Sequence, residues 1–520
     1  MTYVSLNFIF FLAAFFLLFF MVPGTRLKQA VVLAGNIFFY YFAGGIQGLF
    51  VILFISLVTY VASRIMGRIY EPYDKEIEGL DYKAKMALFA SYKKKTKLIL
   101  IPGIILIIGF LVFGKAFRLT GIEAPAMLSP FLMPLGLSYY ALSSTGYMLD
   151  VFWKKTKPET NPIYLILCVS YFPAIVEGPI NKYSKLITEF KGLKGFSYEP
   201  FCRGLQRVLW GFFKKLVIAD RLSLYTSVVY KDPGAYAGFE IIIAVILGAI
   251  QLYTDFSGCI DIGIGISEAI GVKMPENFNQ PFFAKSAAEF WRRWHISLGD
   301  WFKEYISMPL AVNQKVIGVS MKIRKLLGGG RRSVQFSGSF IPLMSVWILT
   351  GLWHGTGLDY LVWGLYWGVL FLLESVFAPD FSALYKKAGI DEKSFGFKFY
   401  LMARTFIFFC IGRMFTVAGS LTGFAIMFKR MFLLNPWVLF DGSLYTHGLD
   451  RKNFYTVLFA VILLFIIDLK KEEKKDIRGL LAAQPRVFRW LCLYMLIFTV
   501  AVFGIYGPGF QASDFVYRGF

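Results

Sequence analysis

Long apolar runs recur along this 520-residue chain, and they constrain its fold more than any other feature. Many approach the roughly 20 residues that an α-helix needs to cross the hydrocarbon core of a bilayer. Hydrophobic residues make up 57% of the chain and charged residues 17%, and the mean hydropathy is +0.58. A soluble protein usually has about 25% charged residues. The sequence therefore predicts an all-α, polytopic integral membrane protein that forms one domain over residues 1–520.

About eleven membrane segments are expected, bounded by turn residues or charged runs. The first, residues 5–22, lacks a basic start and a small-residue cleavage site, so we expect a retained helix and not a signal peptide. An apolar stretch at 162–180 contains two prolines and Glu177, which predicts a broken or re-entrant helix. The other expected segments lie near 29–43, 46–62, 98–113, 131–152, 236–256, 360–378, 399–418, 454–469 and 488–506, with a further apolar run beginning at Phe340.

The charge balance of 55 Lys and Arg against 33 Asp and Glu gives a net charge of +22. In a membrane protein such an excess indicates cytoplasmic loops under the positive-inside rule, so we expect no nucleic-acid partner. The strongest basic run, Lys93–Lys95, predicts a charged cytoplasmic loop at 63–97. Similar runs place 154–161 and 470–485 in the cytoplasm. With these assignments, both termini are expected outside.

Three weaker patterns have structural interpretations. Residues 181–222 mix basic and apolar positions, which predicts an amphipathic helix near the cytoplasmic surface. Gly263 and Gly265 lack the spacing of a dinucleotide fingerprint and favour close helix packing. The five cysteines form no CxxC pair and are expected to be small core residues.

Histidine is the side chain that most readily moves a proton near neutral pH, and the chain has only three. His295 falls in a stretch, 290–305, that predicts one amphipathic helix lying at an interface or dipping into the protein. Its aromatic residues share one face of that helix. The alternative for His295 is an interfacial residue that only makes hydrogen bonds.

His354 follows an apolar run and is flanked by Gly351, Gly355 and Gly357, which would let a substrate or another backbone approach closely. An ionisable residue within a membrane segment is a functional candidate because its burial is costly. His447 lies in a polar loop and is expected to be solvated. Three isolated histidines, without HxxxH or a Cys/His cluster, predict no metal site.

Other polar residues offer weaker candidates. Arg331 and Arg332 follow three glycines and could hold a phosphorylated donor on the cytoplasmic side, or could belong to a flexible basic loop. Asp255 and Glu177 are acids within apolar segments. Each could orient a histidine or cap a broken helix.

Four sequence blocks together resemble the membrane-bound O-acyltransferase family, and more narrowly its bacterial alginate O-acetylase branch. They are Phe-Trp-Arg-Arg-Trp-His-Ile-Ser-Leu at 290–298, Trp-Phe-Lys-Glu-Tyr at 301–305, Leu-Thr-Gly-Leu-Trp-His-Gly at 349–355 and Trp-Gly-Leu-Tyr-Trp-Gly at 363–368. Shorter matches lie at 177–180, 211–220 and 255–258. The aromatic ending of the branch is matched only roughly by 515–520.

The resemblance implies a helical cage with a funnel that thins the membrane, and a core at about 170–378. Acyl donor would enter from the cytoplasm and the acceptor hydroxyl from outside. The near-invariant histidine of the family corresponds to His354 and its second functional histidine to His295. Trp291, Arg292, Arg293 and Trp353 lie in the same blocks and become candidates for the donor site or channel.

The resemblance also implies a multi-pass protein of the bacterial plasma membrane, among membrane lipids, with acetyl-coenzyme A as donor and no bound cofactor. An extracytoplasmic protein would relay the acetyl group to a polysaccharide. Neutral His354 would accept the hydroxyl proton, while His295 would stabilise charge or orient the thioester. One alternative is D-alanyl transfer to teichoic acid from a carrier protein. Another is a transporter or flippase for a lipid-linked sugar.

Chemistry at one site requires the reacting groups to meet. We therefore expect the two imidazoles within about 20 Å of each other, on a tunnel open to both faces, with His295 on its cytoplasmic limb.

Overall fold

The fold is described from a computed structural model, which describes residues 1–120, 122, 125, 128–132 and 134–506. Helices make up 79% of the chain, and no strand occurs in the described part. The prediction of an all-α, polytopic membrane protein is confirmed. The expected external C-terminus and the aromatic ending at 515–520 lie outside the described residues.

Eight helices of the described part are long and apolar enough to cross a membrane. The longest, α2 (Thr25–Glu76), is kinked at Gly45, where φ is +74°. This kink separates the two segments expected at 29–43 and 46–62. A shorter apolar helix, α1 (Leu6–Met21), precedes it. The other candidate spans are α3 (Tyr82–Thr120), α11 (Gly238–Ala269), α16 (Arg331–His354), α17 (Leu358–Lys387), α18 (Phe395–Val417), α20 (Arg451–Glu472) and α22 (Arg486–Phe503).

The chain groups into two compact units, and the first comprises Met1–Val208 and Ile262–Pro275. It contains α1 to α3, the last part of α11 and most of α9 (Tyr198–Phe212). Its shorter helices are α4 (Ser129–Leu132), α5 (Leu137–Phe152), α6 (Pro162–Ser170), α7 (Phe172–Ile175) and α8 (Tyr183–Lys191).

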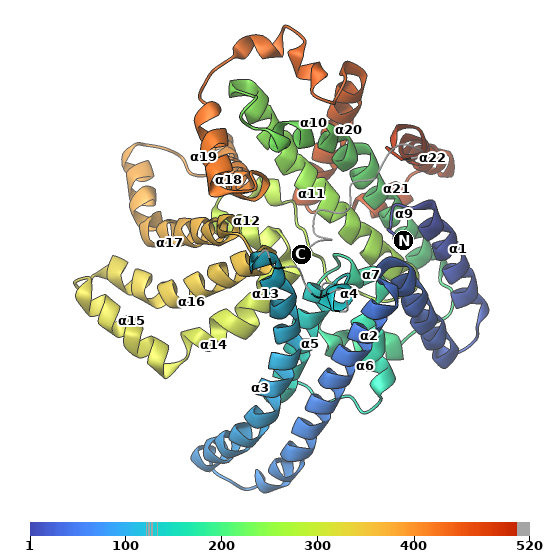
Figure 1. Ribbon diagram of the computed structural model, residues 1–520, viewed down its shortest axis with the longest axis vertical. Coiled ribbons are helices and arrows are strands. Elements are labelled where there is room, and N and C mark those ends of the chain that lie inside the picture. The colour runs from blue at the N-terminus through green and yellow to red at the C-terminus, as the bar shows by residue number, and fades with distance from the viewer. Residues whose placement is uncertain (121, 123–124, 126–127, 133, 507–520) are drawn as a thin grey trace. The chain divides into compact units, whose positions relative to one another are not determined.

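The expected loop at 63–97 is wrong, because α2 and α3 continue through it as a helical hairpin (Figure 1). Tyr70, Tyr73 and Tyr92 form a small core between the two helices. Lys154 lies over the rings of Tyr70 and Tyr73, at 5.2 and 4.3 Å from their centroids, and pairs with Asp74. Charged residues thus line the outside of a packed helix pair.

The broken helix expected at 162–180 is confirmed. Helix α6 ends at Ser170, and α7 ends at Ile175. The amide of Asn36 holds the break, donating to Ser170 Oγ (3.2 Å) and accepting from the backbone N–H of Phe172 (3.0 Å). Glu177 follows in non-helical chain and is fully buried.

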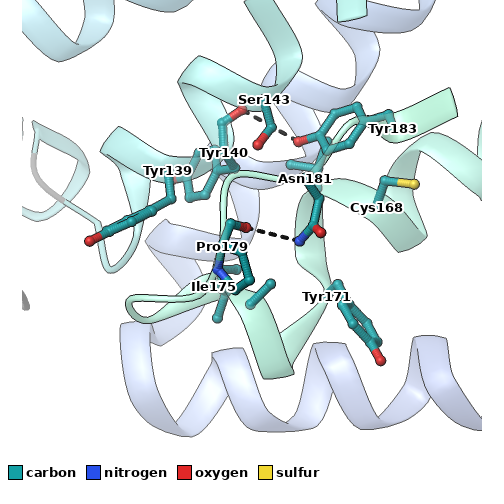
Figure 2. Close-up of a pocket in the computed structure, with 11 residues that line it drawn as sticks. Tyr139, Tyr140, Ser143, Cys168, Tyr171, Ile175, Pro179, Asn181 and Tyr183 are labelled. Carbon is teal, nitrogen blue, oxygen red and sulfur yellow. Dashed lines mark hydrogen bonds between the residues drawn. The ribbon is translucent and has the colours of Figure 1, made fainter. Parts of the chain in front are cut away.

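A small cavity of about 20 Å³ opens beside this break. Tyrosines and Asn181 line it, and the amide nitrogen of Asn181 donates to the Pro179 carbonyl (Figure 2). A cavity of this size has room for about one water molecule.

Close packing at the glycines of α11 is also confirmed in this unit. A Cβ at Gly265 would lie 2.7 Å from the carbonyl oxygen of Gly204, and one at Gly263 would overlap the carbonyl of Pro173. Only a residue without a side chain allows these approaches.

The second unit comprises Leu209–Asp261 and the described part of Glu276–Val516. Its largest packed pair is α16 with α17, which form an antiparallel hairpin (Figure 1). Besides the spans, it contains η1 (Phe213–Ala219), α10 (Asp220–Lys231), η2 (Pro281–Phe283), α12 (Ala287–Arg293), α13 (Ile296–Phe302), η3 (Lys303–Ser307), α14 (Met308–Ala311), α15 (Gln314–Leu326), α19 (Leu421–Arg430), η4 (Pro436–Leu439), η5 (Ser443–Thr446) and α21 (Ile477–Ala482).

The amphipathic helix expected at 181–222 is confirmed in α8 and α9. The segment is not one helix, because it divides into α8, α9, the π-helix η1 and the start of α10. Its basic pair Lys214 and Lys215 is buried, at 4% and 0% exposure, because aspartates within the unit neutralise it.

Candidate functional site

A break in the helix places His295. The single helix expected at 290–305 is wrong, because α12 ends at Arg293 and α13 begins at Ile296. His295 itself adopts the left-handed conformation (φ 47°, ψ 52°), which is uncommon for a residue with a side chain. The cause is a crossing segment: Trp294 forms a β-bridge with Phe278. The backbone N–H of Ile296 also donates to the carbonyl of Asn277 (3.0 Å).

The His295 imidazole is 2% exposed and lies among aromatic rings. The ring of Phe256 from α11 meets it edge-on, with 4.8 Å between centroids, and that of Trp353 lies 6.1 Å away. Burial lowers the pKa of His295 to about 3, because the charged form loses its hydration. His295 is therefore a neutral imidazole at physiological pH.

His354 is the last residue of α16 and is 5% exposed. Trp353 and Trp363 flank it edge-on, with centroid distances of 4.7 and 4.9 Å. Because Trp353 contacts both histidines, the two imidazole centroids are no more than about 11 Å apart. This separation is within the 20 Å expected for a shared site.

Further tryptophans pack behind the rings that flank His354. Trp291 from α12 packs against Trp347, Trp363 and Trp367, with centroid distances between 5.0 and 5.7 Å. The fold thus brings Trp291 and Trp353, two of the predicted residues, together with both histidines. Phe290, from the aromatic face predicted for 290–305, also packs against Trp367 in this cluster.

The glycines around His354 serve helix packing. A Cβ at Gly351 would lie 2.5 Å from the carbonyl oxygen of Tyr360 on α17, and one at Gly355 would overlap the Tyr360 ring. They seat the backbone of α16 against α17 just before the three-residue turn 355–357. The sequence left open whether these glycines admit a substrate or another backbone. At Gly351 the structure shows the backbone of α17.

The arginines of α12 separate into two environments. Arg293 forms ion pairs with Glu289 (2.7 Å) and Glu472 (2.6 Å), so it ties α12 to the end of α20. Arg292 is exposed. Neither packs into the aromatic cluster as Trp291 does.

Arg331 and Arg332 form the first turn of α16, and Arg332 pairs with Asp380 at the surface. The flexible loop considered for this region is wrong, since 314–326 is helix α15. An α-helix rises 1.5 Å per residue, so about 35 Å of α16 separates this basic turn from His354.

Asp255 lies inside the continuous helix α11 and does not cap a broken one. Its carboxylate accepts from Lys215 Nζ (2.6 Å), which also pairs with Asp220 (2.9 Å). This buried group holds η1 against the turn of α11 that presents Phe256 to His295. Lys215 and Phe256 were missed as site residues, although both lie in blocks that carry the resemblance.

The remaining predicted positions lie elsewhere. Glu177 belongs to the first unit, whereas both histidines belong to the second. The solvated environment expected for His447 is wrong, because its Nε2 lies 2.9 Å from Glu240 Oε1 and its side chain is 15% exposed. No group of three or more His, Cys, Asp or Glu within the described residues is arranged to hold a metal ion.

The chain is similar to known proteins over part of its length. Residues 159–319 match the model of MBOAT, the membrane-bound O-acyltransferase family. A probable alginate O-acetylase AlgI of Pseudomonas syringae is 30% identical over 326 residues, covering 63% of this chain and 57% of the relative. The peptidoglycan O-acetyltransferase of Helicobacter pylori is 29% identical over 264 residues, covering 46% of each chain.

The teichoic acid D-alanyltransferase of Bacillus subtilis is 29% identical over 243 residues, which cover 45% of this chain and 57% of the relative. The chain therefore spans less than two thirds of the length of these curated relatives. The matched family region contains His295 and its crossing segment. By this region and these relatives, the chain is similar to the membrane-bound O-acyltransferase family, whose model it matches over residues 159–319.

Proposed function

We propose that this protein is a membrane O-acyltransferase that moves an acetyl group to hydroxyls of an extracytoplasmic polysaccharide or cell-envelope polymer. The observation that carries the proposal is the pair of buried imidazoles that both lie next to Trp353, within about 11 Å of each other. Relatives in the same family are named as O-acetylases or acyltransferases of alginate, peptidoglycan and teichoic acid.

The chemistry needs a base in a dry site. An acceptor hydroxyl, on the relay protein or on the polymer, attacks the carbonyl carbon of the acyl thioester, the carbon–sulfur bond breaks, and the hydroxyl proton must be accepted. His354 is the proposed acceptor, which would return that proton to the departing thiolate. General base catalysis of this kind contributes typically about 10²–10⁴-fold. The surrounding tryptophans would exclude water that otherwise hydrolyses the donor.

The donor and acceptor follow from the same proposal. Acetyl-coenzyme A would supply the acyl group from the cytoplasm, and an extracytoplasmic protein would relay it to the polymer. We also propose that both termini face outward in the bacterial plasma membrane and that a tunnel passes His354. Resistance of Lys94→Cys to an impermeant thiol reagent in intact cells, in a background that lacks the five native cysteines, would support this orientation, and labelling from outside would contradict it.

Purified protein with radiolabelled acetyl-coenzyme A tests the activity directly. Transfer of label to a polysaccharide, or slow hydrolysis without acceptor, is expected. Transfer from a D-alanyl carrier protein instead would favour the activity named for the Bacillus relative. Uptake of lipid-linked sugar without any covalent transfer would overturn the proposal in favour of transport.

A further inference from the structure

Asn277 is fully buried, and it is the residue that His295 contacts through its ring nitrogen Nδ1. The distance from Nδ1 to Asn277 Oδ1 is 3.2 Å. The same oxygen accepts from the backbone N–H of Ser297 (3.0 Å) and from Ser297 Oγ (2.9 Å). One side-chain oxygen therefore joins three groups around the helix break.

The hydrogen bond from Ser297 shows which atom of the Asn277 side-chain amide, oxygen or nitrogen, faces His295. A backbone N–H can only donate, so the atom that it meets must be the oxygen of Asn277 and not its nitrogen. An oxygen that only accepts requires a donor on His295. Nδ1 must then carry the imidazole proton, and in a neutral ring the lone pair is on Nε2.

An asparagine is a costly choice for this position. Its Nδ2 is buried and has no partner among the described residues, and an unmade hydrogen bond of this kind costs about 1–3 kcal/mol. An aspartate would accept all three hydrogen bonds without leaving a donor unpaired. Its negative charge, however, would stabilise the imidazolium form of His295. The amide supplies the same acceptor without that charge.

We propose that Asn277 is a positioning residue that holds His295 neutral with its proton on Nδ1, so that Nε2 faces the reaction as a hydrogen-bond acceptor. This rests on the proposed acyl transfer for its purpose. It also narrows the role of His295. With its one N–H engaged by Asn277, His295 accepts a hydrogen bond while His354 takes the hydroxyl proton, and it does not donate to a developing oxyanion.

Other titratable groups lie on the elements packed against His295. Helix α11 carries Asp255, which Lys215 engages, and α16 carries His354 beside Trp353. On α12, Arg293 is engaged by Glu289 and Glu472. Burial is the influence that sets the pKa of His295, whereas a carboxylate at 277 would act on it directly.

Nitrogen-15 NMR of the purified protein labelled only at histidine tests the tautomer without any assay of activity. The chain has three histidines, so His295→Gln assigns the signal. We expect protonated Nδ1 and unprotonated Nε2 in the wild type, and imidazolium at pH 7 in Asn277→Asp. A wild-type His295 that is protonated on Nε2, or an unchanged neutral signal in Asn277→Asp, would overturn the proposal. This result stands even where no acyl transfer is found.

The pH profile of acyl transfer gives a second readout. A carboxylate raises the pKa of His295, so Asn277→Asp should lose activity at low pH and recover it as the pH rises. One pKa unit above the working pH corresponds to about a tenfold loss. Asn279→Asp, the same change at an exposed position two residues on, is the matched control and should keep the wild-type profile. A uniform loss at every pH in Asn277→Asp would indicate a structural role only.

Discussion

His295 and His354 occupy one kind of environment in the second unit, and His447 occupies another. The first two are 2% and 5% exposed and are surrounded by aromatic rings. The side chain of His447 is 15% exposed and bonds to the carboxylate of Glu240, and the rings of Tyr225 and Tyr236 lie beside it. Burial lowers the pKa of His295, because apolar surroundings disfavour the charged imidazole. Burial among rings therefore distinguishes the two candidate bases from the third histidine.

Removing each histidine in turn should give the largest effect. His354→Ala is expected to lower acyl transfer by about 10²–10⁴-fold, because the proposed proton acceptor is lost. His295→Ala should be severe but less complete. His447→Gln, which keeps a donor for Glu240, should remain near wild type. Transfer of radiolabel by purified variants, normalised to folded protein, measures this.

Near-normal acyl transfer by His354→Ala would show that burial among aromatic rings does not mark a histidine as functional. Loss of activity in His447→Gln with an unchanged melting temperature would equally contradict it.

The packing beneath His354 gives the next effect. Gly351→Ala places a methyl 2.5 Å from the carbonyl oxygen of Tyr360, so the α16–α17 pair must shift. We expect a loss of about 1–3 kcal/mol in stability, as overpacking usually costs, together with reduced activity. Gly338→Ala lies in the same helix with nothing within 4 Å of the new methyl, and should be neutral. Thermal unfolding in detergent compares them, and equal melting temperatures would show that this contact is unimportant.

A fall in pH should have a smaller effect, on the free energy of unfolding through His295. The folded-state pKa of His295 is lowered to about 3, whereas its unfolded value is near 6.5. Below pH 6.5 the unfolded chain binds a proton that the folded chain refuses, so stability falls as pH decreases toward 3. At pH 5 the loss from this group is about 2 kcal/mol.

His295→Gln carries no such proton and should lose less stability than the wild type between pH 7 and 5. Parallel losses in the two proteins, measured by thermal unfolding at each pH, would show that His295 is not held neutral by burial.

The membrane segments could be predicted because hydropathy depends only on local sequence. The helical hairpin at 63–97 could not, since its core is formed by tyrosines from both arms among many charges. The helix break at His295 could not be predicted from the sequence either. It depends on the β-bridge between Trp294 and Phe278, 16 residues earlier, which a helical pattern does not reveal. Asn277 lies in a polar stretch between prolines, and only the fold brings it to the imidazole.

The pairing of Lys215 with Asp255 has a consequence for how the chain enters the membrane. An aspartate near the middle of a helix opposes insertion by roughly 2.5–3.5 kcal/mol. Helix α11 carries Asp255 and Asp261 within its apolar length. Their partners, Lys215 and Lys214, precede them in the chain and are synthesised first. Each charge can therefore be neutralised as α11 leaves the insertion machinery. Replacing Lys214 or Lys215 should therefore reduce the amount of protein inserted in the membrane, apart from any effect on acyl transfer.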